Sequence, residues 1–506
     1  MSDLRDVTIV TPTIGRPSLQ ALLDALAMND GPLPQEIVLV DDRRASGGLN
    51  VAIPPALSSV VRVVRGRGAG PAAARNDGWR SALTAWIAFL DDDVSPPSSW
   101  LADLAADLET ATKHDASASA GRIVVPLPSD RKPTDWERNV AGLQNARWAT
   151  ADMAFRRAAL IDVAGFDERF PRAYREDADL ALRLRKAGHR LTVGNRFIEH
   201  PVRPASRFVS LKLQRGNADD ALMRALHGRQ WRDDAEVFPG RRRAHAATTV
   251  LGAAAIGFGL AGRPRLARAC GAAWAIATSG FALERIAPGP RDRREIAAMA
   301  ATSVAIPPLA MWWWAAGWWR SRGARPWPDR PTAVLFDRDG TLVKDVPYNG
   351  NPELVELQSG ARDVVETLRA RGIRVGVVTN QSGVGRGKLT EREVDAVNAR
   401  LEELVGPIGA FEICPHTEAD GCDCRKPAPG LITAAAAALG AHPKHCVVIG
   451  DIGSDVEAAD NAGARGILVP TPATRHAEVT AARHVAPDLR AALRLALRPD
   501  FVRSGR

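Results

Sequence analysis

Apolar and polar positions follow the same pattern over residues 1–235 and again over residues 331–506. Short runs of β-branched and other apolar residues recur in both regions, and each run ends in polar residues. The runs are VTIVTPT, EIVLVDD and WIAFLDDD in the first region, and TAVLFDRDG, RVGVVTNQSG and HCVVIGDIGSD in the second. Helical periodicity lies between them, which indicates parallel strands with polar groups at their carboxyl ends. We therefore predict two separate α/β domains.

Residues 236–330 interrupt this pattern with three apolar stretches. AHAATTVLGAAAIGFGLAG is about long enough to cross a bilayer, whereas ACGAAWAIATSGFAL is shorter and weaker. The third, IAAMAATSVAIPPLAMWWWAAGWW, is long enough, but Pro307 and Pro308 predict a break in its helix, and its tryptophans favour the headgroup interface. We expect an apolar helical segment that associates with a membrane and joins the two domains. A re-entrant or surface-lying arrangement rivals a hairpin that crosses the bilayer, and a buried hairpin of a soluble domain is the remaining alternative.

The basic residues gather around these apolar stretches. The chain has a formal net charge of +9, and many of its arginines lie in RRR, RPRLAR, PRDRRE and RSRGAR. This placement favours a membrane surface over nucleic acid, for which the sequence offers no binding motif. The amino terminus lacks the apolar run of a signal peptide, which predicts a cytoplasmic protein attached to the cytoplasmic face of the membrane. In that reducing compartment the five cysteines are not expected to form disulfides.

Two carboxylates lie just past a strand of the second region, in FDRDGTL. Asp337 and Asp339 are two positions apart, so one can attack a substrate phosphorus while the other transfers protons. Later loops carry groups suited to phosphate or magnesium, namely Thr379 and Asn380 in TNQSG, Lys426 in RKP, and Asp451 and Asp455 in GDIGSD. A lone acidic pair is weak, because surface loops are rich in acids. Four such loops in this order predict a phosphatase that acts through an aspartyl-phosphate.

Three cysteines and a histidine lie close together in CPHTEADGCDCRKP. They could surround one tetrahedral zinc ion with no position left for a substrate, so the zinc would be structural. The ligands would be Cys414, His416, Cys422 and Cys424. This zinc would fix the loop that carries Arg425 and Lys426. A redox role fits poorly because the segment has no CxxC, and free solvated thiols are the remaining alternative.

The motifs of the second region resemble those of the haloacid dehalogenase superfamily, in particular its D-glycero-D-manno-heptose 1,7-bisphosphate phosphatase and histidinol-phosphatase branch. The resemblance implies a Rossmann-like domain with Asp337 as nucleophile and Asp339 as general acid/base. It implies Mg²⁺ held by Asp337, the Asp339 carbonyl and Asp451, with Asp455 in a supporting role. It also implies phosphate binding by the polar groups named above, substrate contact by Arg425 and a zinc loop of this kind.

Acidic residues also end two strands of the first region. Asp41 lies in VDD, and the triplet 91–93 lies in LDDDV, where carboxylates could hold a divalent cation that bridges a diphosphate. Further along, Glu176 and Asp177 begin an amphipathic helix, and one of them could deprotonate an acceptor hydroxyl. Acids at a helix start are also ordinary capping groups, so each acidic pair alone is weak.

In combination these segments resemble a family 2 glycosyltransferase with a GT-A fold. TPTIGRP, VDD, GPAAARNDGWR, LDDDV and GFDERF…EDADLALRL follow one another in that family's order over roughly residues 6–205. The resemblance implies Mg²⁺ or Mn²⁺ at Asp91 and Asp93, Asp92 near the sugar, and Asp177 as the catalytic base. Nucleotide contacts would come from Thr11, Pro12 and Asp41. His200 in FIEHP is a candidate for a further metal ligand.

One residue departs from this family's pattern. TADMAFRR has Asp152 where a neutral residue is expected, which bears on the donor and acceptor pocket.

We predict a bifunctional enzyme from these observations. The first domain would transfer a sugar from a nucleotide sugar to a glycan or lipid-linked acceptor, and the second would remove a phosphate from a phosphosugar. The fusion to a transferase favours a heptose bisphosphate as the phosphosugar. The alternative is a histidinol-phosphatase whose first domain is a non-catalytic or unrelated binding module.

Overall fold

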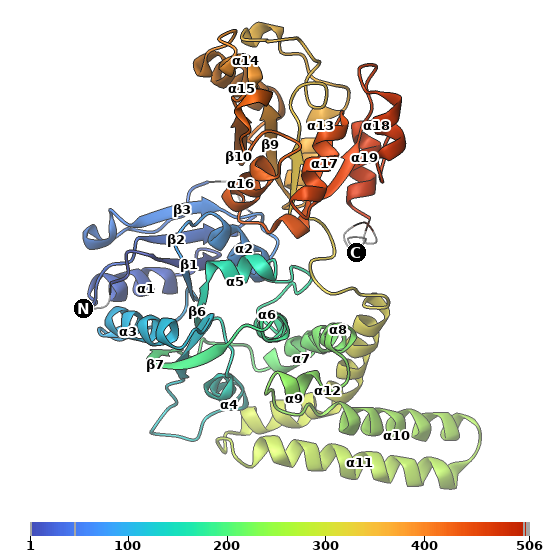
Figure 1. Ribbon diagram of the computed structural model, residues 1–506. Helices are drawn as coiled ribbons and strands as arrows, with labels where there is room; N and C mark the ends of the chain where they lie inside the picture. Colours follow the sequence, from blue (N-terminus) through green and yellow to red (C-terminus); the bar gives the residue numbers. More distant parts are fainter. Residues whose placement is uncertain (1–2, 45–46, 499–500, 502–506) are drawn as a thin grey trace. The chain divides into compact units, whose positions relative to one another are not determined.

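The computed structural model describes residues 3–44, 47–498 and 501 (Figure 1). The chain divides into two compact units. The first comprises residues 1–159 and 166–324, and the second comprises residues 160–165 and 325–506. Each unit contains one β-sheet with helices packed on it, which confirms the prediction of two α/β domains.

The first unit is built on a seven-stranded sheet with the order β3-β2-β1-β4-β6-β5-β7. β6 runs antiparallel to its neighbours β4 and β5, and the other neighbouring strands pair in parallel. The strands are β1 (Val7–Thr13), β2 (Glu36–Asp41), β3 (Val61–Arg65), β4 (Trp86–Leu90), β5 (Ala118–Val124), β6 (Asp152–Arg156) and β7 (Leu191–Glu199). All strands except β6 therefore end at the same edge, which is where α/β sheets bind ligands.

Helices cover both faces of this sheet because its strands are apolar on both sides. Ile9 and Leu39 belong to one core cluster with α1 and α3. Their neighbours along the strands point to the opposite face, where a Cβ on Gly78 of α2 would lie 2.4 Å from Val10 Cγ1. The helices up to the apolar segment are α1 (Ser18–Ala27), α2 (Pro71–Arg80), α3 (Trp100–Lys113), α4 (Asp135–Ala141), α5 (Arg157–Asp162), α6 (Glu176–Lys186), α7 (Val209–Leu213), α8 (Asn217–His227) and α9 (Trp231–Asp234).

The apolar segment folds into three helices of the first unit: α10 (Arg242–Leu260), α11 (Pro264–Ile286) and α12 (Arg293–Arg320). Pro307 and Pro308 lie inside α12, which continues past them, so the predicted helix break is wrong. Packing explains the difference. α12 lies against α7, α8, α10 and α11, and Gly317 comes so close to α8 that a Cβ there would lie 2.5 Å from Ala218 Cα. These contacts outweigh the loss of backbone hydrogen bonds at the two prolines.

Two of the three helices, α11 and α12, are long and apolar enough to cross a membrane by length and composition. This differs from the expectation from sequence, in which the stretch in α10 is the stronger candidate and the stretch in α11 the weaker. α10 and α11 lie side by side (Figure 1) and bury little of their surface. Exposed apolar side chains on the pair include Val250, Ile256, Leu260, Leu266, Ile276 and Leu283.

The second unit has a five-stranded parallel sheet with the order β10-β9-β8-β11-β12. Its strands are β8 (Ala333–Phe336), β9 (Arg374–Asn380), β10 (Ala410–Cys414), β11 (Cys446–Gly450) and β12 (Arg465–Leu468). Its helices are α13 (Ala361–Ala370), α14 (Ser382–Gly385), α15 (Glu391–Val405), α16 (Gly430–Ala438), α17 (Gly453–Asn461), α18 (His476–Ala481) and α19 (Leu489–Ala496). The chain order reverses between β8 and β11, and a ligand crevice is expected at the carboxyl end of such a switch point.

Candidate active sites

The second unit gathers its polar residues at this switch point. Asp337 follows β8 directly, is buried, and its backbone N–H donates to Ile449 O of β11 at 2.9 Å. The next turn passes close to Asp451. Gly340 has φ = +82° there, and a Cβ on it would lie 2.3 Å from Asp451 Oδ2. The turn therefore requires glycine at this position.

Lys426 is the buried cation of this site. Its Nζ donates to Asp337 Oδ1 at 2.5 Å, to Asp455 Oδ1 at 2.6 Å and to Val378 O at 2.9 Å. Burial opposes the charge of Lys426, but Asp337 and Asp455 together hold its pKa above the ordinary value. Burial raises the pKa of Asp337 well above its ordinary value, and the nearby charge of Asp455 adds to this effect while Lys426 opposes it. The geometry suits a carboxylate nucleophile beside a fixed positive charge.

The two predicted phosphate ligands after β9 have protein partners. The side-chain amide of Asn380 holds the backbone of Lys426, because Nδ2 donates to Lys426 O at 3.2 Å and Oδ1 accepts from Lys426 N at 3.1 Å. Thr379 Oγ1 accepts a hydrogen bond from Gln381 Nε2 at 2.9 Å. Asn380 therefore positions Lys426, and direct contact of either residue with phosphate stays a prediction.

Asp339 is held in place by Arg338 and Gln381, which the sequence patterns did not single out. Arg338 is buried and donates to Asp339 Oδ2 through Nη2 at 3.0 Å, while its Nη1 donates to Asn398 Oδ1 of α15 at 2.9 Å. Gln381 Nε2 donates to Asp339 Oδ2 at 2.7 Å. Arg338 in DRD and Gln381 in TNQ lie inside motifs that could have suggested a role. Asn398 on α15 lies outside every motif, so nothing in the sequence indicated that it contacts Arg338. These contacts fix the carboxylate of the predicted general acid/base.

Three carboxylates of this site fit a hard divalent cation. One oxygen each of Asp337, Asp451 and Asp455 lie within 4.8 Å of one another, and all three residues are buried. Burial, followed by the charge of Asp455, raises the pKa of Asp451 to about 6. Oxygen ligands in this arrangement suit Mg²⁺.

The cysteine loop brings together all four residues predicted to bind zinc. Cys424 Sγ lies 3.3 Å from Cys414 Sγ, 3.4 Å from Cys422 Sγ and 3.3 Å from His416 Nδ1. A tetrahedral zinc would place such ligand atoms about 3.5–3.8 Å apart, so the cluster needs only a small expansion to hold one. Arg425 follows directly, and its backbone N–H donates to Cys422 Sγ at 3.4 Å. The cluster is therefore built into the loop that leads to Lys426.

In the first unit, the predicted site residues lie along the carboxyl edge of the sheet. Asp41 at the end of β2 accepts from Arg43 Nε at 2.8 Å and from Arg65 Nη1 at 2.7 Å. The hydrogen bond from Arg43 lowers the pKa of Asp41, although burial opposes it. Asp92 accepts from Thr13 Oγ1 at 2.6 Å and from Arg16 Nη1 at 2.7 Å. The arrangement brings arginines beside the carboxylates expected to meet the nucleotide and the sugar.

Asp93 and His200 lie together, as a shared metal would require. His200 Nε2 is 3.8 Å from Asp93 Oδ1, and Arg203 Nη2 forms an ion pair with Asp93 Oδ2 at 2.9 Å. Burial raises the pKa of Asp93, and the charge of Asp91 adds to this effect. The buried His200 Nδ1 has no hydrogen-bond partner among the described residues. The nitrogen that faces Asp93 is Nε2, however, and Asp91, Asp93 and His200 do not form a cluster of ligand atoms within 4.8 Å of one another among the described residues, so a divalent cation here stays a prediction.

Arg75 of α2 is a further residue that sequence reasoning missed. It is fully buried and joins two acids, because Nη2 donates to Asp91 Oδ1 at 2.7 Å and Nη1 donates to Glu176 Oε1 at 2.9 Å. Burial, then the charge of Asp177, raises the pKa of Glu176 to about 8. The position of Arg75 in the motif GPAAARNDGWR could have suggested a role for it. Its partner Glu176, however, lies 101 residues further along the chain. Arg75 ties the start of α6 to the acidic triplet.

The predicted base and the β1 residues have the following surroundings. Burial raises the pKa of Asp177, whose Oδ1 accepts from the backbone N–H of Ala178 at 2.7 Å. Thr11 is buried, and its hydroxyl has no hydrogen-bond partner among the described residues, which suits a ligand contact. Pro12 lies beside it in β1. The catalytic and binding roles of these residues stay predictions.

Asp152 does not face the ligand edge. Its Oδ1 accepts from Arg196 Nε at 2.8 Å, and its Oδ2 accepts from Trp100 Nε1 at 2.9 Å. Arg196 is completely buried and also bonds Asp107 and Ser119. The departure from the family pattern thus supplies the counter-charge for a buried arginine.

Comparisons with known proteins divide the chain in the same way. The family model described as glycosyl transferase family 2 matches residues 8–175, and a model described as HAD-hydrolase-like matches residues 423–492.

Several similar proteins are heptose-bisphosphate phosphatases. The probable D-glycero-D-manno-heptose-1,7-bisphosphate 7-phosphatase of Thermoplasma volcanium is 36% identical over 147 residues, which cover 28% of this chain and 98% of the relative. The D-glycero-beta-D-manno-heptose-1,7-bisphosphate 7-phosphatase of Neisseria meningitidis serogroup A is 35% identical over 144 residues, which cover 27% of this chain and 76% of the relative. Among solved structures, a D,D-heptose 1.7-bisphosphate phosphatase from B. bronchiseptica complexed with magnesium and phosphate is 28% identical with a TM-score of 0.30, covering 32% of this chain and 96% of the other.

Proposed function

We propose a two-reaction enzyme on the premise that the chain belongs to the HAD-like phosphatases homologous to the heptose-1,7-bisphosphate phosphatases and carries a family 2 glycosyltransferase domain as well. The second unit removes one phosphate from a phosphosugar, and the first unit transfers a sugar from a nucleotide sugar. D-glycero-D-manno-heptose 1,7-bisphosphate is the phosphosugar that we favour, because the curated relatives are named for it.

The phosphatase reaction proceeds in two steps through Asp337. In the first, an Asp337 carboxylate oxygen bonds to the phosphorus while the bond to the sugar oxygen breaks, and Asp339 gives its proton to that oxygen. In the second, Asp339 takes a proton from water, whose oxygen attacks the aspartyl-phosphate and releases inorganic phosphate and the Asp337 carboxylate. The two aspartates end in their starting states.

Positive charge around the phosphate makes this attack feasible. Lys426 is already in place, since its Nζ lies 2.5 Å from Asp337 Oδ1. Mg²⁺, when bound by the carboxylates of Asp337, Asp451 and Asp455, supplies further charge for the phosphate oxygens. The contact of a fully buried lysine with the predicted nucleophile is the observation that carries this proposal, because it has no role in an ordinary surface loop.

For the transferase, we propose a metal-assisted inverting displacement. The acceptor oxygen bonds to the anomeric carbon while the bond to the nucleoside diphosphate breaks, and Asp177 takes the acceptor proton. Asp91 and Asp93, with His200, would hold Mg²⁺ or Mn²⁺ at the diphosphate, and Asp92 would lie nearer the sugar. Thr11, Pro12 and Asp41 would contact the nucleotide. The acceptor is a glycan or a lipid-linked glycan.

We further infer attachment to the cytoplasmic face of a membrane through α10 and α11. The exposed apolar side chains of this pair would enter the headgroup region, and the arginines at its ends would meet anionic lipids. Both substrate classes are made in the cytoplasm, which supports placing both units on that side.

Phosphate release by the purified chain tests the phosphatase proposal. With Mg²⁺, we expect release from D-glycero-D-manno-heptose 1,7-bisphosphate, assayed as both anomers beside other sugar phosphates and histidinol phosphate. Asp337→Asn should abolish it, because the amide cannot attack phosphorus. The loss should be at least ~10³-fold, in line with removal of a catalytic nucleophile.

The matched control is Asp395→Asn, the same change at an exposed position on α15. It should release phosphate at the wild-type rate. Release from histidinol phosphate alone would contradict the heptose proposal, and equal rates for Asp337→Asn and the wild type would remove Asp337 from the mechanism.

A further inference from the structure

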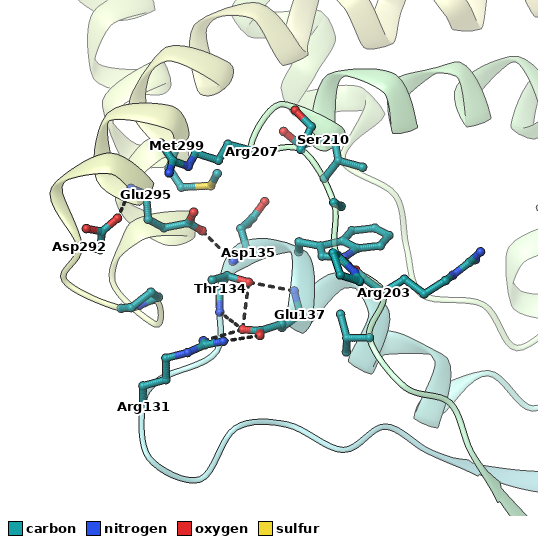
Figure 2. Close-up of a pocket in the computed structure, with 17 residues that line it drawn as sticks. Arg131, Thr134, Asp135, Glu137, Arg203, Arg207, Ser210, Asp292, Glu295 and Met299 are labelled. Atoms are coloured by element: carbon teal, nitrogen blue, oxygen red, sulfur yellow. Dashed lines mark hydrogen bonds and ion pairs between the residues drawn. The ribbon is translucent and has the colours of Figure 1, made fainter. Parts of the chain in front are cut away.

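A cavity of about 480 Å³ lies in the first unit, between the start of α4, the segment 202–210 that follows β7, and the turn from α11 to α12 (Figure 2). Its volume is within the range of small-molecule sites. None of the described residues that line this cavity has been assigned a role in either reaction. Its walls come from three parts of the chain that are distant in sequence. Two of them, α4 and the segment 202–210, follow β5 and β7 at the carboxyl edge of the sheet.

One residue connects this cavity to the predicted metal site of the transferase. Arg203 reaches Asp93 with its guanidinium at 2.9 Å, and its backbone oxygen, in the cavity wall, accepts from Trp136 Nε1 at 2.7 Å. The cavity is therefore at most one arginine side chain away from the acidic triplet.

The strand order places the cavity on the acceptor side of that triplet. The predicted nucleotide residues lie on β1 and β2, the triplet follows β4, and the cavity walls follow β5 and β7 at the other end of the sheet. In a displacement the acceptor must approach the anomeric carbon from the side opposite the leaving diphosphate. A site beyond the triplet, away from the nucleotide, meets this requirement.

The lining suits a neutral ligand with both apolar and hydroxyl surfaces. Trp136 and Met299 supply apolar contact, and Ser210, which is 9% exposed, has a buried hydroxyl with no hydrogen-bond partner among the described residues. The lining holds four carboxylates (Asp135, Glu137, Asp292 and Glu295) against three arginines (Arg131, Arg203 and Arg207). Arg131 and Glu137 pair with each other, as Figure 2 shows. Carboxylates thus outnumber arginines in the lining, and the Arg203 guanidinium is already paired with Asp93, so the cavity offers hydrogen-bond donors and acceptors but does not attract an anion.

We propose that this cavity is the acceptor subsite of the transferase and that it binds a neutral sugar residue of the acceptor glycan. The carbon face of the sugar packs on the apolar residues, and its hydroxyls bond Ser210 and the carboxylates. This inference rests on the proposed transferase function and adds the substrate class on the acceptor side.

Binding of simple glycosides to the full chain tests this inference. The probes are methyl α-D-mannopyranoside, methyl β-D-glucopyranoside and methyl β-D-galactopyranoside, with methyl β-D-glucuronide as the anionic comparison, measured by saturation-transfer NMR in detergent micelles. We expect at least one neutral glycoside to bind. Ala205→Trp, which fills the cavity from an exposed lining position, should weaken that binding at least ~10-fold, and Ser210→Ala should weaken it roughly 3- to 10-fold through the lost hydrogen bond.

Ala106→Trp on the exposed side of α3 is the matched control and should bind like the wild type. Thermal unfolding of each preparation, compared with the wild type, reports whether the first unit of the variant is folded. The inference is overturned if no neutral glycoside binds, if only the glucuronide binds, or if Ala205→Trp binds as well as the control.

A separate measurement on the wild type distinguishes failure of the acceptor-subsite proposal from failure of the transferase proposal. Binding of UDP, GDP and ADP is measured with Mn²⁺ present. If a nucleotide binds and no glycoside does, the acceptor subsite is wrong while the transferase proposal stands. If glycosides bind at the cavity and no nucleotide does, the transferase proposal fails, and the acceptor role fails with it.

Discussion

Arg196 carries its charge in the core of the first unit with no exposed surface, and its surroundings account for that charge completely. Nε donates to Asp152, Nη1 to Asp107 and Ser119 Oγ, and Nη2 to Ser119 O, at 2.7–3.0 Å. Gly121 lies so close that a Cβ there would be 2.1 Å from Asp152 Oδ2. Arg196 has two buried acidic partners, so removal of Asp152 leaves the guanidinium with Asp107 alone and leaves its Nε without an acceptor.

Asp152→Ala should therefore destabilise the first unit by about 2–4 kcal/mol, because Arg196 Nε and Trp100 Nε1 lose their buried acceptor while Asp107 still pairs with the guanidinium. The measurement is chemical denaturation followed by tryptophan fluorescence. Asp130→Ala, the same change at an exposed position, is the control and should leave the unfolding midpoint unchanged. The double change Asp152→Ala with Arg196→Met should recover part of the loss. Equal midpoints for Asp152→Ala and Asp130→Ala would show that the pair is not structurally important.

Residues at strand ends could be predicted from the sequence, whereas their partners could not. Asp337 and Asp91 follow apolar runs, and the carboxyl ends of parallel strands are where polar groups meet. Arg75 and Asn398 belong to helices that reach those ends only after folding, and although Arg75 lies in a segment typical of the family, nothing in the local sequence of either residue identifies its partners. Asp152 was noticed as unusual, but its partner Arg196 lies 44 residues away on another strand.

At the scale of elements, the strands and the zinc loop followed from local patterns, and α12 did not. Cys414, His416, Cys422 and Cys424 lie within eleven residues, so their meeting needs only a short loop. Pro307 and Pro308 disfavour a helix locally, yet packing on several other helices keeps α12 continuous. Contacts of that range are not encoded in any short window of sequence.

The pair α10 and α11 gives an element-scale prediction. Ile256 is 68% exposed and Ile276 is 74% exposed. The double change Ile256→Glu with Ile276→Glu should weaken co-sedimentation with vesicles that contain anionic phosphatidylglycerol at least ~10-fold, because each isoleucine would otherwise bury its side chain in the lipid interface. Leu83→Glu, at a position that is 80% exposed after α2, is the control and should sediment like the wild type. Sedimentation of the double variant at the wild-type level would contradict the membrane proposal.

For the whole molecule, the residues of each proposed reaction lie within one unit, and this separates the two activities. Asp91→Ala should abolish metal-dependent binding of nucleoside diphosphate while phosphate release stays at the wild-type rate. Asp337→Asn should do the reverse, because changes at sites with no shared partners act independently. Both variants are assayed for both functions in parallel. Loss of phosphate release in Asp91→Ala would show that the two sites are coupled.

The pair of Asp152 and Arg196 also limits how this chain can evolve. Exchange of Asp152 alone leaves Arg196 with one carboxylate in place of two, and exchange of Arg196 alone leaves the buried Asp152 carboxylate without its cation, so a lineage has to pass through a destabilised intermediate or change both together. Related transferase domains with a neutral residue at the position of Asp152 are therefore expected to lack arginine at the position of Arg196. This covariation should be visible in aligned sequences even though neither residue faces a substrate.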